Sequence, residues 1–255
     1  MKITKIAFPQ EHGSWGFFLE PLFLSLAVAY SSHGAIIALS AFFIFLAHQP
    51  VRLFLDKKTE RKNKKIALLF IFGYLIVIVL SLWEVSEIVS FETMIPYIIA
   101  LTLMGGFLII ELVTEKEDFL ARLIPPLAVD FIAITIVLAD GWALPKAEAF
   151  YLVLFSRSLT TALYIHEKLK KMRKQEINRL IVYTTHVLFM IALAYTSSKG
   201  LTPYLSIFAV VVMLVRALSG LETKKKTNVK KVGLWEFSHG LIFVIINAIG
   251  YLMNW

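Results

Sequence analysis

The sequence predicts an all-α membrane protein, a bundle of about nine transmembrane helices with a cytoplasmic N-terminus. Three observations predict it: the composition, the spacing of the apolar stretches, and the distribution of lysine and arginine. Of the 255 residues, 58% are hydrophobic and 17% are charged, against about 45–50% and about 25% in soluble domains. This composition is typical of a chain that lies largely within a lipid bilayer.

Apolar stretches long enough to cross a bilayer, about 17–25 residues, follow one another along the whole chain. The expected spans cover residues 13–31, 34–54, 65–83, 92–113, 121–139, 146–165, 178–196, 201–220 and 232–253. The connections between them are short, so we expect residues 1–255 to form a single integral membrane domain. Because Pro21, Pro125 and Pro126 lie within spans, we expect the helices there to be discontinuous.

Lysine and arginine gather on one side of this arrangement. With the N-terminus inside, 22 of the 26 Lys and Arg residues lie in or beside inner segments, only Lys146 and Lys199 lie outside, and Arg157 and Arg216 lie within spans. Basic residues mark cytoplasmic loops, so we expect a multi-pass protein of the cell membrane with its N-terminus in the cytoplasm. These basic segments lack interleaved aromatic residues and suit anionic lipids better than nucleic acid. We therefore expect no nucleic-acid partner.

A polar stretch from Phe45 to Lys58 ends the second span and opens a basic segment. His48, Arg52 and Asp56 lie four residues apart and would share one face of a helix. Polar side chains at membrane depth are rare unless they have a function, which makes these residues candidates for a polar cavity that opens toward the cytoplasm. The structural alternatives are an Arg52 side chain that reaches the lipid headgroups and an Asp56 side chain solvated in a loop.

A second polar stretch, from Phe155 to Glu167, lies in the sixth span and contains Arg157, Thr161 and Tyr164. An arginine keeps its proton and needs a carboxylate, a group of carbonyls or an anionic ligand when it is buried. Arg157 is therefore either one half of an ion pair or a fixed cation for a phosphate or carboxylate. The carboxylates within reach of such a pair are Glu20, Asp130 and Glu111.

Further titratable residues stand at the inner ends of the first and ninth spans. His12 begins the first span, and Glu236 and His239 begin the ninth. A His–Glu pair there could carry a proton, but no H-E-x-x-H or comparable ligand spacing is present, and we expect no metal site. No catalytic residue follows from spacing; the candidates are His12, His48 and Asp56. The candidate substrate-binding residues are His48, Arg52, Arg157, Thr161, Tyr164, Glu236 and His239.

Two motifs resemble a known family. The segment Pro9-Gln10-Glu11-His12-Gly13-Ser14-Trp15-Gly16 with Glu20-Pro21 is one, and Arg157-Ser158-Leu159-Thr160-Thr161-Ala162-Leu163-Tyr164 is the other. Together they resemble the YwiC-like family over nearly the whole chain. This resemblance implies a polytopic membrane protein, but no mechanism.

The arrangement of spans also resembles the UbiA superfamily of intramembrane prenyltransferases, with nine helices and a cavity that opens inward. Its first motif, Asn-x-x-x-Asp-x-x-x-Asp, falls on His48, Arg52 and Asp56, of which only the last is retained. Its second, Asp-x-x-x-Asp, is unmatched, since Arg157 and Thr161 stand there. The aspartates of that superfamily hold Mg²⁺, which these arginines would repel, although they could themselves bind a diphosphate. Mg²⁺ is therefore a doubtful cofactor, and the cofactor stays unknown.

Three hypotheses stay open. In the first, a prenyltransferase-like protein binds an isoprenoid diphosphate or another anionic lipid through Arg52 and Arg157. If this protein is an enzyme, it also transfers the isoprenoid. In the second, a proton-coupled carrier of small solutes uses Glu20, Asp130 and His186 as a relay within the membrane. In the third, the protein is a non-catalytic membrane assembly subunit whose polar cavity is structural.

Overall fold

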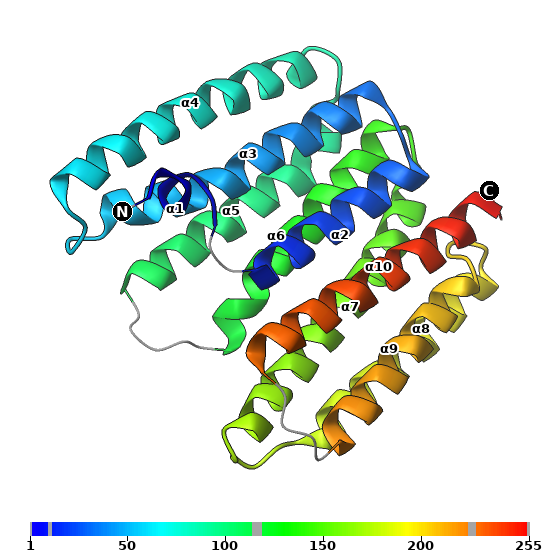
Figure 1. The fold of residues 1–255 in the computed structure, drawn as a ribbon. Coiled ribbons are helices and arrows are strands. Elements are labelled where there is room, and N and C mark those ends of the chain that lie inside the picture. The colour runs from blue at the N-terminus through cyan, green and yellow to red at the C-terminus, as the bar shows by residue number, and fades with distance from the viewer. Residues whose placement is uncertain (1, 10–11, 114–118, 224–227, 254–255) are drawn as a thin grey trace.

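The computed structural model describes residues 2–9, 12–113, 119–223 and 228–253. Within these ranges the chain forms ten α-helices and no β-strand (Figure 1). The helices are α1 (Ile3–Ala7), α2 (His12–Val28), α3 (Ser32–Leu55), α4 (Arg61–Ser86), α5 (Phe91–Val113), α6 (Phe119–Ala139), α7 (Leu144–Met172), α8 (Arg179–Ser198), α9 (Leu205–Glu222) and α10 (Val229–Met253).

The long helices α2 to α10 coincide with the expected apolar stretches, which confirms the all-α fold. The largest difference in a boundary is at α7, which continues to Met172 rather than ending at residue 165. There Lys168 and Lys171 donate hydrogen bonds to the Gly220 and Leu221 carbonyls near the end of α9. These contacts stabilise the last part of α7, because lysine can satisfy the free carbonyls at a helix C-terminus, here that of α9. The residues of this last part are mostly polar, so a hydropathy pattern does not show that the helix continues.

Prolines do not interrupt the helices of the described residues. Helix α2 is continuous through Pro21, and α6 is continuous through Pro125 and Pro126, so the predicted discontinuity is wrong. A proline removes one hydrogen bond from a membrane helix, and neighbouring helices can compensate for that loss. Here α2 packs against α6 and α10, and α6 packs against α2, α3, α5 and α7.

The outer surface is strongly apolar. Six described helices, α3, α4, α5, α8, α9 and α10, are long and apolar enough to cross a membrane, and α2 and α6 carry shorter apolar stretches. On α4 the side chains of Leu69, Phe72, Leu80 and Trp83 are exposed. Such a surface requires lipid rather than water around it. The protein is therefore a multi-pass membrane protein, while the number of crossings and their direction stay predictions.

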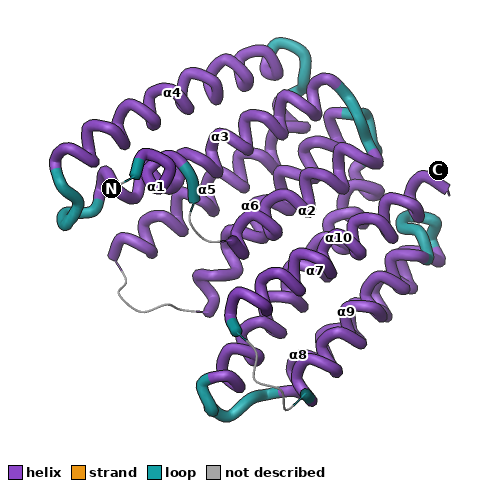
Figure 2. The backbone as a smooth tube through the Cα atoms, viewed as in Figure 1, coloured by secondary structure: helices purple, strands orange, loops and turns teal. Residues whose placement is uncertain are grey.

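Helices α2 and α6 form a partition between two apolar cores. One core contains Phe150 of α7, Met213 of α9 and Phe243 of α10. The other contains Ile37 of α3 and Tyr97 of α5. Both cores include side chains of α2 and α6. Figure 1 accordingly shows α4 at one edge of the bundle and α8 and α9 at the opposite edge, and Figure 2 shows the connecting loops gathered at its two ends.

Candidate functional site

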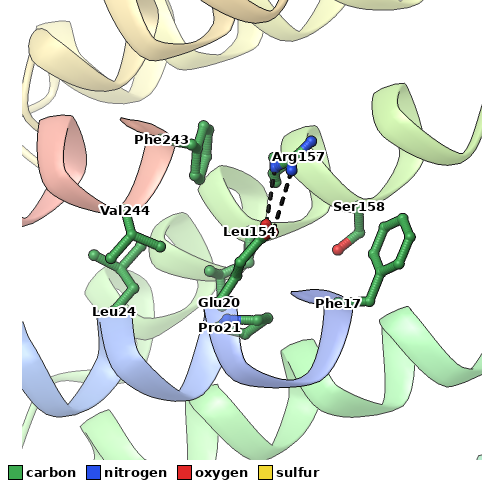
Figure 3. Close-up of a pocket in the computed structure, with 9 residues that line it drawn as sticks. All are labelled: Phe17, Glu20, Pro21, Leu24, Leu154, Arg157, Ser158, Phe243 and Val244. Carbon is green, nitrogen blue, oxygen red and sulfur yellow. Dashed lines mark hydrogen bonds and ion pairs between the residues drawn. The ribbon is translucent and has the colours of Figure 1, made fainter. Parts of the chain in front are cut away.

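Arg157 lies near the middle of α7 and points into the bundle toward Glu20 of α2 (Figure 3). Its Nε donates to Glu20 Oε2 at 3.0 Å, and its Nη2 donates to Oε1 at 3.3 Å. The same Nη2 donates to the main-chain carbonyl of Glu236 at 3.1 Å. Both side chains are less than one-tenth exposed. This two-point geometry is typical of a strong arginine–carboxylate pair.

A second pair continues the network toward α9 and α10. Arg216 Nη1 donates to Glu236 Oε2 at 2.5 Å, and Arg157 Nη1 lies 3.8 Å from the same oxygen. The Thr161 hydroxyl accepts hydrogen bonds from both arginines. Two cations and two carboxylates therefore alternate across α2, α7, α10 and α9. Their formal charges cancel, which makes their joint burial tolerable in an apolar interior.

A glycine makes room for this network. A Cβ atom added at Gly240 of α10 would fall on the Glu20 carboxylate. The absence of a side chain therefore lets the carboxylate of α2 approach the α10 backbone. This explains how Glu20 reaches Arg157 between two closely packed helices.

Two further titratable groups lie buried nearby. Asp130 of α6 accepts a hydrogen bond from the Ser158 hydroxyl at 3.2 Å, while its Oδ2 has no partner among the described residues. His186 of α8 lies 2.7 Å through Nδ1 from the Val182 carbonyl, which assigns the proton to Nδ1. Its Nε2 has no hydrogen-bond partner in the described parts of the chain.

A small pocket opens between α2, α7 and α10 (Figure 3). Glu20, Arg157 and Ser158 supply its polar lining, and Pro21 and Phe243 part of its apolar lining. Its volume is about 10 Å³, close to the lower limit for one water molecule. In this conformation the pocket can therefore hold a water beside the ion pair, but not a solute.

The comparison with protein families gives a match over about half of the chain. A family model of YwiC-like proteins matches residues 8–139. The chain belongs to the YwiC-like family. The matched half of this YwiC-like protein includes Glu20 and Asp130, whereas Arg157, Arg216 and Glu236 lie beyond it. Neither a curated protein nor a solved structure matched the chain.

The first polar stretch of this YwiC-like protein forms a separate cluster between α3 and α5. His48 Nε2 lies 2.9 Å from Glu111 Oε2, and Arg52 Nη1 lies 3.2 Å from Glu111 Oε1. The His48 ring stacks on Phe107. Arg52 is 47% exposed at its side chain, whereas Arg157 is 6% exposed. The two arginines thus pair with different glutamates in different surroundings.

Other candidates from the sequence take local roles in the described structure. Asp56 follows the last residue of α3 as its C-cap, and accepts hydrogen bonds from the Lys58 N–H at 2.9 Å and the Thr59 hydroxyl at 3.1 Å. The Lys58 N–H and the Thr59 hydroxyl hold the pKa of the Asp56 carboxyl below its usual range. His239 lies 2.7 Å through Nδ1 from the Trp235 carbonyl of its own helix. His12 begins α2, but its side chain lies outside what the structure describes.

Sequence reasoning omitted Arg216 from the binding set, although this residue completes the network with Glu236 and packs over the ring of Tyr164, 4.5 Å from its centre. The signal was present, since an arginine within an apolar stretch needs a partner. Among the described residues, no three His, Asp or Glu side chains are grouped closely enough to hold a metal ion.

Replacing Glu111 by glutamine should cost at most about 1 kcal/mol, because the ion pair with half-exposed Arg52 is screened by solvent. The measurement is the thermal midpoint in detergent, at low and high salt. Glu84→Gln, the same change at an exposed position of α4, is the matched control. A loss above about 3 kcal/mol would show instead that the cluster behaves as a buried ion pair.

Proposed function

We propose that this YwiC-like protein is a proton-coupled transporter of a small solute. The observation that carries the proposal is the buried, alternating network of Glu20, Arg157, Glu236 and Arg216, with a pocket against its first pair. Ionisable groups inside a membrane bundle are costly and mark ion or substrate pathways. We place the protein in the cell membrane with its N-terminus in the cytoplasm, on the distribution of lysine and arginine.

Glu20 is the proposed proton site. An arginine cannot release its proton, whereas a carboxylate can accept one. A proton on Glu20 removes the charge that balances Arg157, and the pair at 3.0 Å loses its main attraction. Asp130, which is joined to the pocket through Ser158, is the proposed neighbouring carboxyl in the relay. The network then has two charge states, one with Glu20 ionised and one with Glu20 protonated, as a proton-coupled carrier requires.

The position of α2 supports a conformational response. Glu20 lies on a helix that packs into both apolar cores, so a change in its ion pair acts directly on the contact between the two halves of the bundle. Rocking of one helical group against another around a fixed site is a general mechanism of alternating access. A pocket with room for about one water fits a conformation that is closed around the site.

Proteoliposomes that contain a pH-sensitive dye test this proposal. Small carboxylates, phosphate, amino acids, sugars and amines are added outside in turn, and acidification of the lumen is recorded. We expect at least one solute class to acidify wild-type vesicles, and Glu20→Gln to slow this at least tenfold. Glu84→Gln is the matched control, since it neutralises an exposed glutamate. The proposal fails if no class acidifies wild-type vesicles, or if Glu20→Gln retains the wild-type rate.

Binding of an anionic lipid is the second candidate function. The observation that favours it is Arg52, half-exposed near the end of α3 beside His48 and Glu111. An isoprenoid diphosphate held by Arg52 and Arg157, and the resemblance to the UbiA superfamily that suggested it, stay predictions. In the described structure both arginines are paired with glutamates, so such a ligand would have to displace a carboxylate from each. The hypothesis that the protein is a non-catalytic membrane assembly subunit also stays a prediction.

Thermal midpoints in detergent with geranylgeranyl diphosphate, with and without Mg²⁺, test this second candidate. A ligand at a hundredfold over its dissociation constant adds about 2.7 kcal/mol to the stability of the folded state. The second candidate predicts a Mg²⁺-independent rise that is lost in Arg52→Ala and in Arg157→Ala, each compared with its own midpoint without ligand. No rise in the wild type would exclude this isoprenoid as the ligand.

A further inference from the structure

Arg216 differs from Arg157 in how much of its guanidinium is used. All three nitrogens of Arg157 have hydrogen-bond partners. Arg216 uses Nη1 for Glu236 and Thr161, but its Nε and Nη2 have no partner among the described residues. The Arg216 side chain is only 4% exposed. A buried cation with two unused donors is unusual, because buried polar groups are normally hydrogen-bonded.

The two unused nitrogens lie on the same edge of the guanidinium. The Nε–H and one Nη2–H are parallel donors, and this pair matches the two oxygens of a carboxylate or phosphate. Glu236 occupies the other terminal nitrogen. The edge that is best suited to an oxyanion is therefore the one left without a partner.

The surroundings hold this guanidinium in a fixed orientation. Arg216 Cζ lies 4.5 Å from the centre of the Tyr164 ring, a cation–π contact. That ring lies against α9 where Gly220 leaves room, since a Cβ at Gly220 would collide with the Tyr164 hydroxyl. With Glu236 and Thr161 on Nη1, Arg216 is preorganised before any ligand arrives, which reduces the entropy cost of binding.

We propose that the Nε–Nη2 edge of Arg216 binds the oxyanion group of the transported solute, a carboxylate or a phosphate. This inference rests on the proposed transport function and names its substrate class. The charges balance: the network is neutral with Glu20 and Glu236 ionised, and one proton on Glu20 compensates one bound anionic charge. Proton and oxyanion would therefore enter the bundle together as a neutral load, which avoids an unpaired buried charge.

Isothermal titration of the purified protein in a neutral detergent tests the site, with acetate, inorganic phosphate and phosphatidic acid as probes. We expect the wild type to bind at least one probe and Arg216→Lys to bind it at least tenfold more weakly, because lysine keeps the charge but lacks the two-donor edge. Arg179→Lys, the same change at a half-exposed arginine that pairs with Glu222, should keep the wild-type affinity. Binding to phosphatidic acid alone would identify a lipid headgroup as the source of the oxyanion.

A second variant guards against loss of folding. The double variant Arg216→Gln/Glu236→Gln removes both charges of the pair at once. We expect it to fold but to lose oxyanion binding. The inference is overturned if the wild type binds no probe, or if both Arg216 variants bind like the wild type. The vesicle assay with Glu20→Gln is independent of this measurement. Oxyanion binding without proton uptake would support the Arg216 site and contradict the transport function. Proton uptake without Arg216-dependent binding would support the transport function and contradict the Arg216 site.

Discussion

Replacing Arg157 by alanine is expected to destabilise the folded protein by about 3–5 kcal/mol, the cost of leaving a buried carboxylate without its partner. The reason is local: Glu20 is 9% exposed and receives two of its hydrogen bonds from this arginine. The loss should appear as a large fall in the thermal midpoint in detergent. The double variant Glu20→Met/Arg157→Met should regain most of it, because apolar side chains of similar size can replace a buried ion pair at little cost.

The control for this pair is Arg52→Ala at the other arginine–glutamate contact. Arg52 is half-exposed, so its loss should cost less than about 1 kcal/mol. Equal losses for the two arginines would contradict the difference in burial on which the prediction rests. A double variant no more stable than Arg157→Ala would show that the arginine acts through packing rather than through its charge.

Replacing Gly240 by alanine is the second large expected effect. In an open helix this change stabilises by about 1 kcal/mol. At Gly240 the new Cβ falls on the Glu20 carboxylate, and either the ion pair or the contact between α10 and α2 must shift. Overpacking of this kind typically costs about 1–3 kcal/mol. We therefore expect a lower thermal midpoint and, in proteoliposomes, slower solute-driven proton uptake.

Gly233 supplies the matched control on the same helix, since a Cβ added there meets nothing within 4 Å. Gly233→Ala should leave proton uptake unchanged, and its thermal midpoint should equal or exceed that of the wild type. If Gly240→Ala behaved like Gly233→Ala in both measurements, the close approach of Glu20 to the α10 backbone would be wrong.

The sequence by itself determined the membrane character and the positions of the long helices. Apolar stretches such as 65–83 and 232–253 lie within α4 and α10, because a helix is the one open-ended structure that satisfies its own backbone hydrogen bonds in lipid. It also identified Arg157 as a buried cation in need of a partner. The end of α7 escaped prediction, because the lysines that extend it are held by carbonyls of α9.

Only the tertiary structure decided which charges meet. Sequence reasoning left Arg157 a choice of Glu20, Asp130 and Glu111; the structure pairs it with Glu20 and gives Glu111 to His48 and Arg52. It also brought Arg216 to Glu236 and left one edge of that guanidinium unused. The physical reason is that spacing along a helix fixes which face a side chain shares, whereas its partner depends on how neighbouring helices pack and where a glycine lets them approach.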